Sequence, residues 1–163
     1  MKQLLIVFHS RTGGARQMAE AALRGACAEP GIAARLLGAA EAQADDILRA
    51  DGYLFIAPEN LAALAGEMKE FFDRTYYAVL ERINGRPYAA MVCAGSDGSN
   101  ALRQIERICT GWRLKRVAEP FIVCTHAQTP ERILAAKVIT EQDVQRCAET
   151  GQAVAAGLAL GIF

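Results

Sequence analysis

The stretch FHSRTGGARQM, residues 8–18, determines the fold that we expect for this chain. It follows the apolar run LLIV at residues 4–7 and leads into a segment in which Met18, Ala22 and Ala26 recur every four residues. The apolar run is typical of a strand that is buried on both faces, and the four-residue spacing is typical of an amphipathic helix. A strand and a helix joined by a glycine-rich turn are therefore predicted.

The alternation of strand-like and helix-like segments continues to the end of the chain. Strands are predicted at residues 2–8, 32–37, 52–57, 87–94 and 117–125. Helices are predicted at residues 14–28, 41–50, 66–80 and 101–112, and after an N-cap at Thr140. This pattern predicts a three-layer α/β fold, a doubly wound five-stranded parallel sheet in the order 2-1-3-4-5 with helices on both faces. A single domain is expected, because 163 residues suit one core and no linker or repeat interrupts them.

The composition argues against several kinds of partner. Eighteen basic and eighteen acidic side chains cancel, so no net field attracts nucleic acid. The longest apolar runs, at residues 4–8 and 153–163, are far shorter than the roughly 20 residues of a membrane-spanning helix, and the first residues do not resemble a signal peptide. The five cysteines form no CxxC pair, which is typical of a cytoplasmic protein whose cysteines are small core residues.

Ligands of doubly wound sheets bind at the carboxyl ends of the strands, so the loops after the first, third and fourth predicted strands form the candidate site. The first loop is SRTGGA, residues 10–15, at the start of a helix. Helix N-termini attract anions, Ser10 and Thr12 can donate hydroxyl hydrogen bonds, and adjacent glycines let the backbone close around a phosphate. Arg11 or Arg16 can offset its charge. An ordinary capped glycine turn is the alternative, and the spacing matches neither the dinucleotide fingerprint nor the nucleoside triphosphate loop.

The second loop is APENLAALAGEM at residues 57–68, and the third is CAGSDGSN at residues 93–100. In the second loop, a turn at residues 58–60 that exposes backbone amides and is followed by leucines could border a flat aromatic ring. The alternative is a helix-entry turn whose leucines close the core. The third loop either brings glycines, serines and an aspartate to the same end of the sheet or is a flexible turn capped by Ser96 or Asp97.

Together, the three loops resemble those of the flavodoxin-like flavoprotein superfamily, in particular the small bacterial flavodoxin-family proteins related to NAD(P)H-dependent FMN and quinone reductases. SRTGGA is similar to the family's phosphate loop, PENLAALAGEMKEFFDRTYY to its second flavin loop and following helix, and GSDGSNALRQIERI to its third. The resemblance implies noncovalent binding of FMN. It implies that the phosphate binds to Ser10, Arg11, Thr12, Gly13, Gly14 and Ala15. It implies that the ring lies between Pro58, Glu59, Asn60 and Leu61 of the second loop and Ala94, Gly95, Ser96, Asp97 and Gly98 of the third.

The chain departs from the family pattern at two points. Where flavodoxins typically read Ser-x-Thr-Gly-Asn-Thr, this chain has Gly14 and Ala15. This removes a side-chain amide and a hydroxyl from the phosphate site, and each such hydrogen bond is worth about 0.5–1.5 kcal/mol. Neither ring-flanking loop carries the Trp or Tyr that usually stacks on the flavin.

Three functions are compatible with the resemblance. The first is an enzyme in which FMN accepts a hydride from NADPH or NADH and passes electrons to a small-molecule acceptor such as a quinone or free flavin. The second is a carrier of single electrons between redox proteins, and the third is a binding module without flavin. Zero net charge gives little steering of protein partners, and the missing aromatic leaves room for a nicotinamide, so both features favour the enzyme. No catalytic residue is assigned, because the flavin carries the chemistry.

Two further segments have two interpretations each. His126, in the segment CTHAQTP, either donates a proton to a reduced substrate or is a solvated loop histidine. The last eleven residues, AVAAGLALGIF at 153–163, carry no charge. They either pack on the sheet or form a homodimer interface.

Overall fold

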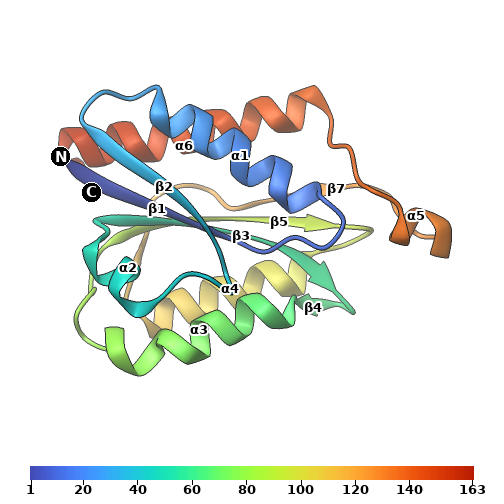
Figure 1. Ribbon diagram of the computed structural model, residues 1–163, viewed down its shortest axis with the longest axis horizontal. Helices are drawn as coiled ribbons and strands as arrows, with labels where there is room; N and C mark the ends of the chain where they lie inside the picture. Colours follow the sequence, from blue (N-terminus) through green and yellow to red (C-terminus); the bar gives the residue numbers. More distant parts are fainter.

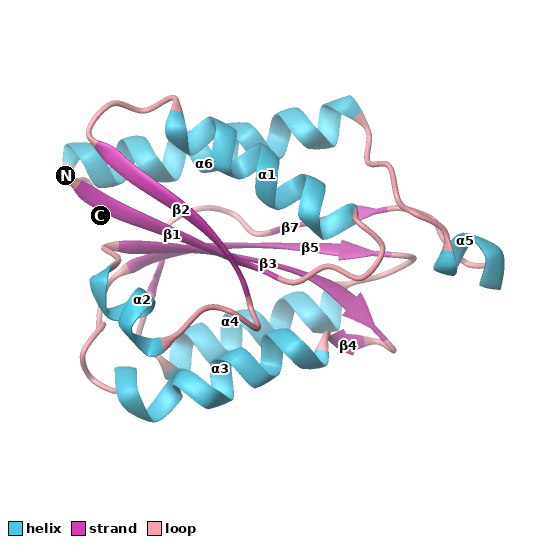
Figure 2. Ribbon diagram, in the orientation of Figure 1, coloured by secondary structure: helices cyan, strands magenta, loops and turns pink.

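The computed structural model describes the whole chain, residues 1–163, and has three layers (Figure 1). The strands are β1 (Lys2–Phe8), β2 (Ile32–Gly38), β3 (Gly52–Asn60), β4 (Ala63–Leu64), β5 (Pro87–Ala94), β6 (Lys115–Arg116) and β7 (Phe121–Cys124). The helices are α1 (Gly14–Cys27), α2 (Ala44–Arg49), α3 (Gly66–Val79), α4 (Ser99–Gly111), α5 (Pro130–Leu134) and α6 (Glu141–Leu160). Helices α1 and α6 cover one face of the sheet, and α2, α3 and α4 cover the other (Figure 2).

The sheet has the order β2-β1-β3-β5, with β6 and β7 both paired to the free side of β5. All these pairs are parallel; only β4 is antiparallel, to β3. The predicted doubly wound fold is therefore confirmed. Its order follows from βαβ connections, which return each strand parallel to a neighbour and cover the faces with helices.

The predicted fifth strand, residues 117–125, is wrong in detail because it is divided into β6 and β7. β5 pairs Tyr88 with Arg116 and Met91 with Phe121, so the four residues 117–120 lie opposite the two residues 89–90. Pro120 has no N–H to donate to the ladder, which favours an interruption at this point. The division leaves β7 ending at the same edge of the sheet as β1, β3 and β5 (Figure 1).

Two hydrophobic cores lie on either side of the sheet. The core under α2, α3 and α4 is built on aromatic rings, with the centroids of Phe55 and Phe72 5.0 Å apart and those of Phe72 and Trp112 5.2 Å apart. The core under α1 and α6 uses smaller side chains, including the predicted Met18 and Ala22. Small residues let the α1 and α6 backbones approach each other closely.

The predicted burial of the cysteines is confirmed for three of the five. Cys93, Cys109 and Cys147 are buried, but Cys27 is exposed at the end of α1 and Cys124 is half-buried at the end of β7. The uncharged C-terminal segment is likewise divided. Val154, Ala155 and Leu158 are buried in the core, whereas Leu160 and Ile162 are exposed. No helix of the structure is long and apolar enough to cross a membrane.

Candidate functional site

The candidate site lies at the carboxyl ends of β1, β3, β5 and β7. In Figure 1 this edge is on the right, whereas both chain termini lie on the left, at the other end of the sheet. The three loops singled out from the sequence all start at this edge, because their strands are adjacent and parallel. Close packing and hydrogen bonds join these loops to one another.

The first loop leads into a helix start that no side chain caps. α1 begins at Gly14, and its N-cap is Gly13, which has a left-handed φ of 99° and provides no side-chain cap. The N–H groups of the first helical turn have no intrahelical partner, and together with the positive end of the helix dipole they favour the binding of an anion. Ser10 Oγ accepts a hydrogen bond of 3.1 Å from Gly13 N, and the hydroxyl hydrogens of Ser10 and Thr12 donate to no group in the chain. These groups remain available to a phosphate.

The packing around Gly14 explains why this position departs from the flavodoxin pattern. A Cβ added to Gly14 would lie 2.5 Å from Cys93 Sγ and 3.5 Å from Lys137 Cβ. The start of α1 therefore rests directly on the end of β5, and a side chain at residue 14, such as the asparagine that flavodoxins usually have, would require the Cys93 side chain to shift. This close approach also places the first loop beside the third.

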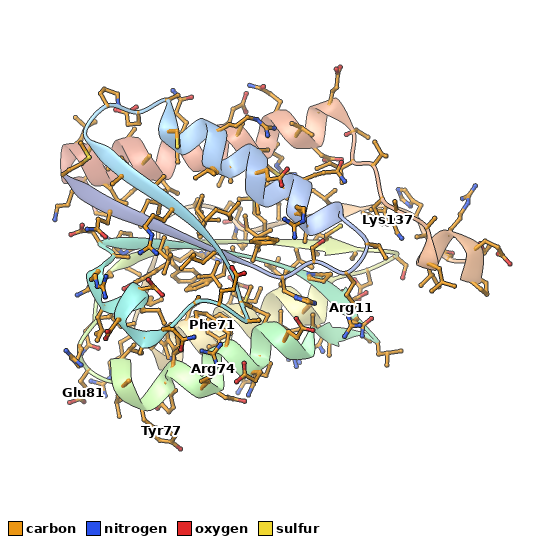
Figure 3. All side chains as sticks on the ribbon, viewed as in Figure 1. Arg11, Phe71, Arg74, Tyr77, Glu81 and Lys137 are labelled. Atoms are coloured by element: carbon orange, nitrogen blue, oxygen red, sulfur yellow. The ribbon has the colours of Figure 1, made fainter.

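Of the two arginines near the first loop, only Arg11 is free. Arg16 lies over the Phe8 ring, 5.0 Å from its centroid, and forms a long ion pair of 3.9 Å with Glu20. Arg11 is exposed and forms no hydrogen bond or ion pair. Figure 3 shows Arg11 at the site edge, at the same end of the molecule as Lys137. Arg11 is thus the arginine that can reach a bound anion.

A wall of the site that the sequence did not predict comes from the segment between α5 and α6. Gln17 Nε2 donates to Gly13 O at 2.9 Å and to Lys137 O at 2.6 Å, and Ile139 N donates to Gln17 Oε1 at 3.3 Å. Lys137 N donates to Thr12 O at 2.8 Å. The contacts with Lys137 and Ile139 join residues more than 100 positions apart in the sequence, and no local pattern reveals them.

The predicted turn at residues 58–60 is wrong. Pro58, Glu59 and Asn60 continue β3, which forms a hairpin with β4 through the pairs Glu59–Leu64 and Asn60–Ala63. The turn consists of Leu61 and Ala62, with φ of 50° and 59°. Two-residue hairpin loops favour positive φ because it matches the twist of the strands, although glycine or asparagine usually occupies them. Leu61 is 95% exposed at the tip.

Three hydrogen bonds fix this hairpin to the third loop and α4. Gly98 N donates to Glu59 Oε2 at 2.7 Å, Asn100 Nδ2 donates to Ala62 O at 2.8 Å, and Leu64 N donates to Gln104 Oε1 at 2.7 Å. The carboxylate of Glu59 is therefore committed to the backbone of the third loop. The second and third loops form one unit.

The third loop ends in a tightly packed glycine. Gly98 is the N-cap of α4 with φ of 84°, and an added Cβ would lie 2.9 Å from both Ala94 Cβ and Ile122 Cγ2. Asp97 accepts hydrogen bonds from the backbone and hydroxyl of Ser99, at 3.3 and 2.7 Å. Asp97 thus bonds locally within the turn, whereas α4 itself has Gly98 as its N-cap and no side-chain cap. Ala94 ends β5, and Gly95 and Ser96 follow it at the site edge.

His9 connects the end of β1 to the start of α3. Its Nδ1 lies 2.9 Å from Glu67 Oε2, while its Nε2 is the one buried side-chain nitrogen or oxygen without a hydrogen-bond partner. Burial lowers the pKa of His9 below its ordinary value of 6.5, Glu67 opposes this shift, and Arg11 adds to it. A neutral His9 donates Nδ1–H to Glu67 and leaves the Nε2 lone pair unused. Buried acceptors without a partner are uncommon in folded proteins, so His9 Nε2 is a candidate contact for a ligand or an ordered water.

We expect His9 to make folding stability depend on pH. Because its folded pKa is lowered, the unfolded chain binds this proton more readily, so stability is highest above pH 6.5 and falls as the pH drops through the folded pKa. Thermal unfolding of the protein between pH 8 and pH 5 should show a decline that is smaller in a His9→Gln variant. An equal decline in the melting temperature of the two proteins would contradict the assignment of this pH dependence to His9.

Comparison with known proteins identifies the family. The sequence model of the NADPH-dependent FMN reductase family matches residues 35–129, which include the second and third loops. A flavodoxin of Aquifex aeolicus is 33% identical over 98 residues, 60% of this chain and 53% of that protein. An NAD(P)H dehydrogenase (quinone) of Acidithiobacillus ferrooxidans is 32% identical over 95 residues, 46% of this chain and 48% of that protein. The chain thus spans about half the length of the curated relatives that it matches.

Among solved structures, a flavodoxin from the domain Archaea superposes with a TM-score of 0.77 at 18% identity, covering 96% of this chain and 98% of that one. At this identity the likeness establishes the fold only. The match to the family model covers more than half of the chain. The protein therefore belongs to the NADPH-dependent FMN reductase family, within the flavodoxin-like flavoprotein superfamily.

Proposed function

We propose that this protein binds FMN noncovalently and passes electrons from NADPH or NADH through it to a small acceptor such as a quinone or a free flavin. The observation that carries the proposal is the uncapped start of α1, with left-handed Gly13 and unused hydroxyls on Ser10 and Thr12. It lies at the same sheet edge as the hairpin and the third loop (Figure 1). The family match supports the assignment of the flavin.

The residues present fit a flavin with a terminal phosphate. The first N–H groups of α1 and the hydroxyls of Ser10 and Thr12 would hold the phosphate, and Arg11 would offset its charge. The strand end at residues 58–60, Leu61 and the loop at residues 94–98 would border the ring. FMN supplies the ability to accept a hydride and to release electrons singly or in pairs. The protein binds and orients it, so no catalytic side chain is required.

The second candidate is a single-electron carrier, which the similarity to a flavodoxin favours. Carriers that meet charged partner proteins gain association rate from complementary charge. The present chain has a net charge of zero, which supports the enzyme over the carrier.

Anaerobic titration of the FMN-loaded protein with NADPH and with NADH tests the proposal. The flavin absorption band is expected to bleach within seconds for at least one nicotinamide and to return on addition of a quinone. A bound flavin that resists both nicotinamides but accepts electrons from a flavodoxin reductase would favour the carrier. A folded protein that binds no FMN would overturn both candidates.

The bond between Glu59 and Gly98 should control FMN affinity. We expect Glu59→Ala to weaken FMN binding at least about tenfold, because a charge-assisted hydrogen bond worth about 1.5–3 kcal/mol no longer holds the third loop. Glu59→Gln keeps an acceptor oxygen and should retain more of the affinity. Glu149→Ala on α6, whose carboxylate contacts only Gln145, is the matched control. Fluorescence titration measures the FMN affinity of the wild type and of the three variants. Equal affinity of the wild type and Glu59→Ala would refute the role of Glu59 in FMN binding.

A further inference from the structure

We propose that Cys124 and His126 form a reactive thiol–imidazole pair, a site of reversible oxidation by hydroperoxides that controls the third loop. Cys124 is the last residue of β7 and pairs with Ala94 of β5, so its thiol lies where the third loop begins. Its Sγ is 3.6 Å from His126 Nδ1 and 3.6 Å from the carbonyl oxygens of both Gly95 and Ser96. A nucleophile and a base thus lie within hydrogen-bonding distance, beside loop backbone.

The backbone holds His126 in place for this contact. Its φ of 56° is left-handed, a conformation that non-glycine residues seldom adopt. The preceding residue, Thr125, is tied to Ala94 O by its N–H at 2.8 Å and by its hydroxyl at 3.2 Å. Imidazole with its proton on Nε2 can accept the thiol proton at Nδ1, and the side chain is exposed, so that proton exchanges with water.

The other four cysteines lack such a partner. Burial raises the pKa of Cys93 to about 11 and that of Cys147 to about 12, and it also raises the pKa of Cys109. A thiol that remains protonated is a poor nucleophile. Cys27 is exposed at the end of α1 but forms no hydrogen bond. Cys27 is therefore an internal control, because its thiol is accessible but has no neighbouring base.

The oxidation step balances with a hydroperoxide as the only co-reactant. The Cys124 sulfur attacks the terminal oxygen of the hydroperoxide, an S–O bond forms and the O–O bond breaks. Sulfur loses two electrons and the peroxide gains them. The thiol proton passes by way of His126 to the departing oxygen, so the thiol and the hydroperoxide give a sulfenic acid and an alcohol, or water from hydrogen peroxide. Two external thiols restore Cys124: the first condenses with the sulfenic acid to a mixed disulfide and releases water, and the second attacks the external sulfur, which frees the Cys124 thiol and leaves a disulfide of the two external thiols.

Oxidation acts on the third loop because the thiol already touches it. An added Cβ on Gly95 would lie 2.8 Å from Ala127 O, so the backbones of the loop and of the segment after β7 are in direct contact. An oxygen added to the Cys124 sulfur requires space beside Gly95 O and Ser96 O, which both lie 3.6 Å from that sulfur. We expect the loop to move. That this movement weakens FMN binding rests on the function proposed above.

The test uses the full-length protein without nicotinamide, treated with hydrogen peroxide and with dimedone to trap sulfenic acid, followed by mass spectrometry. Cys124 should be labelled at least about tenfold faster than Cys27, because only Cys124 has a base within hydrogen-bonding distance that can take up its proton during the attack. His126→Asn retains a residue that tolerates positive φ but lacks the base, and it should reduce the rate at Cys124 to that at Cys27. Equal labelling rates at Cys124 and Cys27 would contradict the proposed thiol–imidazole pair. An unchanged labelling rate at Cys124 in the His126→Asn variant would contradict it as well.

Two further measurements separate this inference from the proposed function. Amide hydrogen exchange at residues 94–98 should increase after oxidation in the wild type and not in Cys124→Ser, whether or not FMN binds. FMN affinity should fall about tenfold on oxidation, which corresponds to the loss of one hydrogen bond. Unchanged exchange would refute control of the loop. Absence of FMN binding with increased exchange would refute the proposed function but support the thiol switch.

Discussion

Replacing Gly151 with alanine is expected to lower the melting temperature by about 10 °C, corresponding to about 3 kcal/mol for a domain of this size. Gly151 lies in α6, and an added Cβ would be 2.0 Å from Ala22 O in α1. The same holds in the other direction, because a Cβ added to Gly25 of α1 would lie 1.9 Å from Ala148 O in α6. Backbone atoms cannot rotate away as a side chain can, so the two helices must separate and expose the core beneath them.

A matched control distinguishes this contact from an effect of glycine replacement itself. Gly111 ends α4, and an added Cβ there meets nothing within 4 Å. Gly111→Ala should be neutral or stabilising by up to about 1 kcal/mol, the difference in helix propensity between alanine and glycine. Calorimetry of both variants checks the prediction. If Gly151→Ala has the same melting temperature as the wild type, α1 and α6 pack less closely than described.

The second large effect is expected at Gly14. Gly14→Ala should reduce FMN affinity roughly five- to a hundred-fold, because overpacking worth about 1–3 kcal/mol displaces the start of α1 from β5. The Cβ would meet Cys93 Sγ at 2.5 Å, and removal of that sulfur leaves only contacts of 3.5 Å or longer. The double variant Gly14→Ala/Cys93→Ala should therefore recover most of the affinity.

FMN titration and thermal unfolding of the two single variants, the double variant and the wild type form a double-mutant cycle. We expect strong coupling, with the double variant binding FMN more tightly than Gly14→Ala alone. Additive effects would mean that Gly14 and Cys93 act independently. In that case the departure from the flavodoxin pattern at residue 14 would have another cause.

The sequence predicted the sheet and the edge at which the site lies, because those features depend on local periodicity. The apolar runs that became β1 and β5 were located to the residue, since buried parallel strands are continuously apolar. The hairpin of β3 and β4 was not predicted. Pro58 suggested a turn, whereas the turn is made by Leu61 and Ala62, whose side chains give no sign of positive φ.

Within the candidate site, the sequence indicated which loops converge but not how they are joined. The bond from Gly98 to Glu59 spans 39 residues, and that from Gln17 to Lys137 spans 120. Such contacts arise only when the chain is folded, so no periodicity encodes them. For the same reason, the cysteine composition predicted core thiols and did not distinguish Cys124, whose neighbour His126 approaches it through an unusual backbone angle.

The central claim is that the start of α1 holds the phosphate of a flavin. Its most direct test is a comparison of FMN with riboflavin, which lacks the phosphate, by fluorescence titration of the full-length protein. Two charge-assisted hydrogen bonds from the helix start and the loop hydroxyls correspond to at least about a hundred-fold difference in affinity. We expect FMN to bind more tightly by that factor. Equal affinities for FMN and riboflavin would contradict the claim.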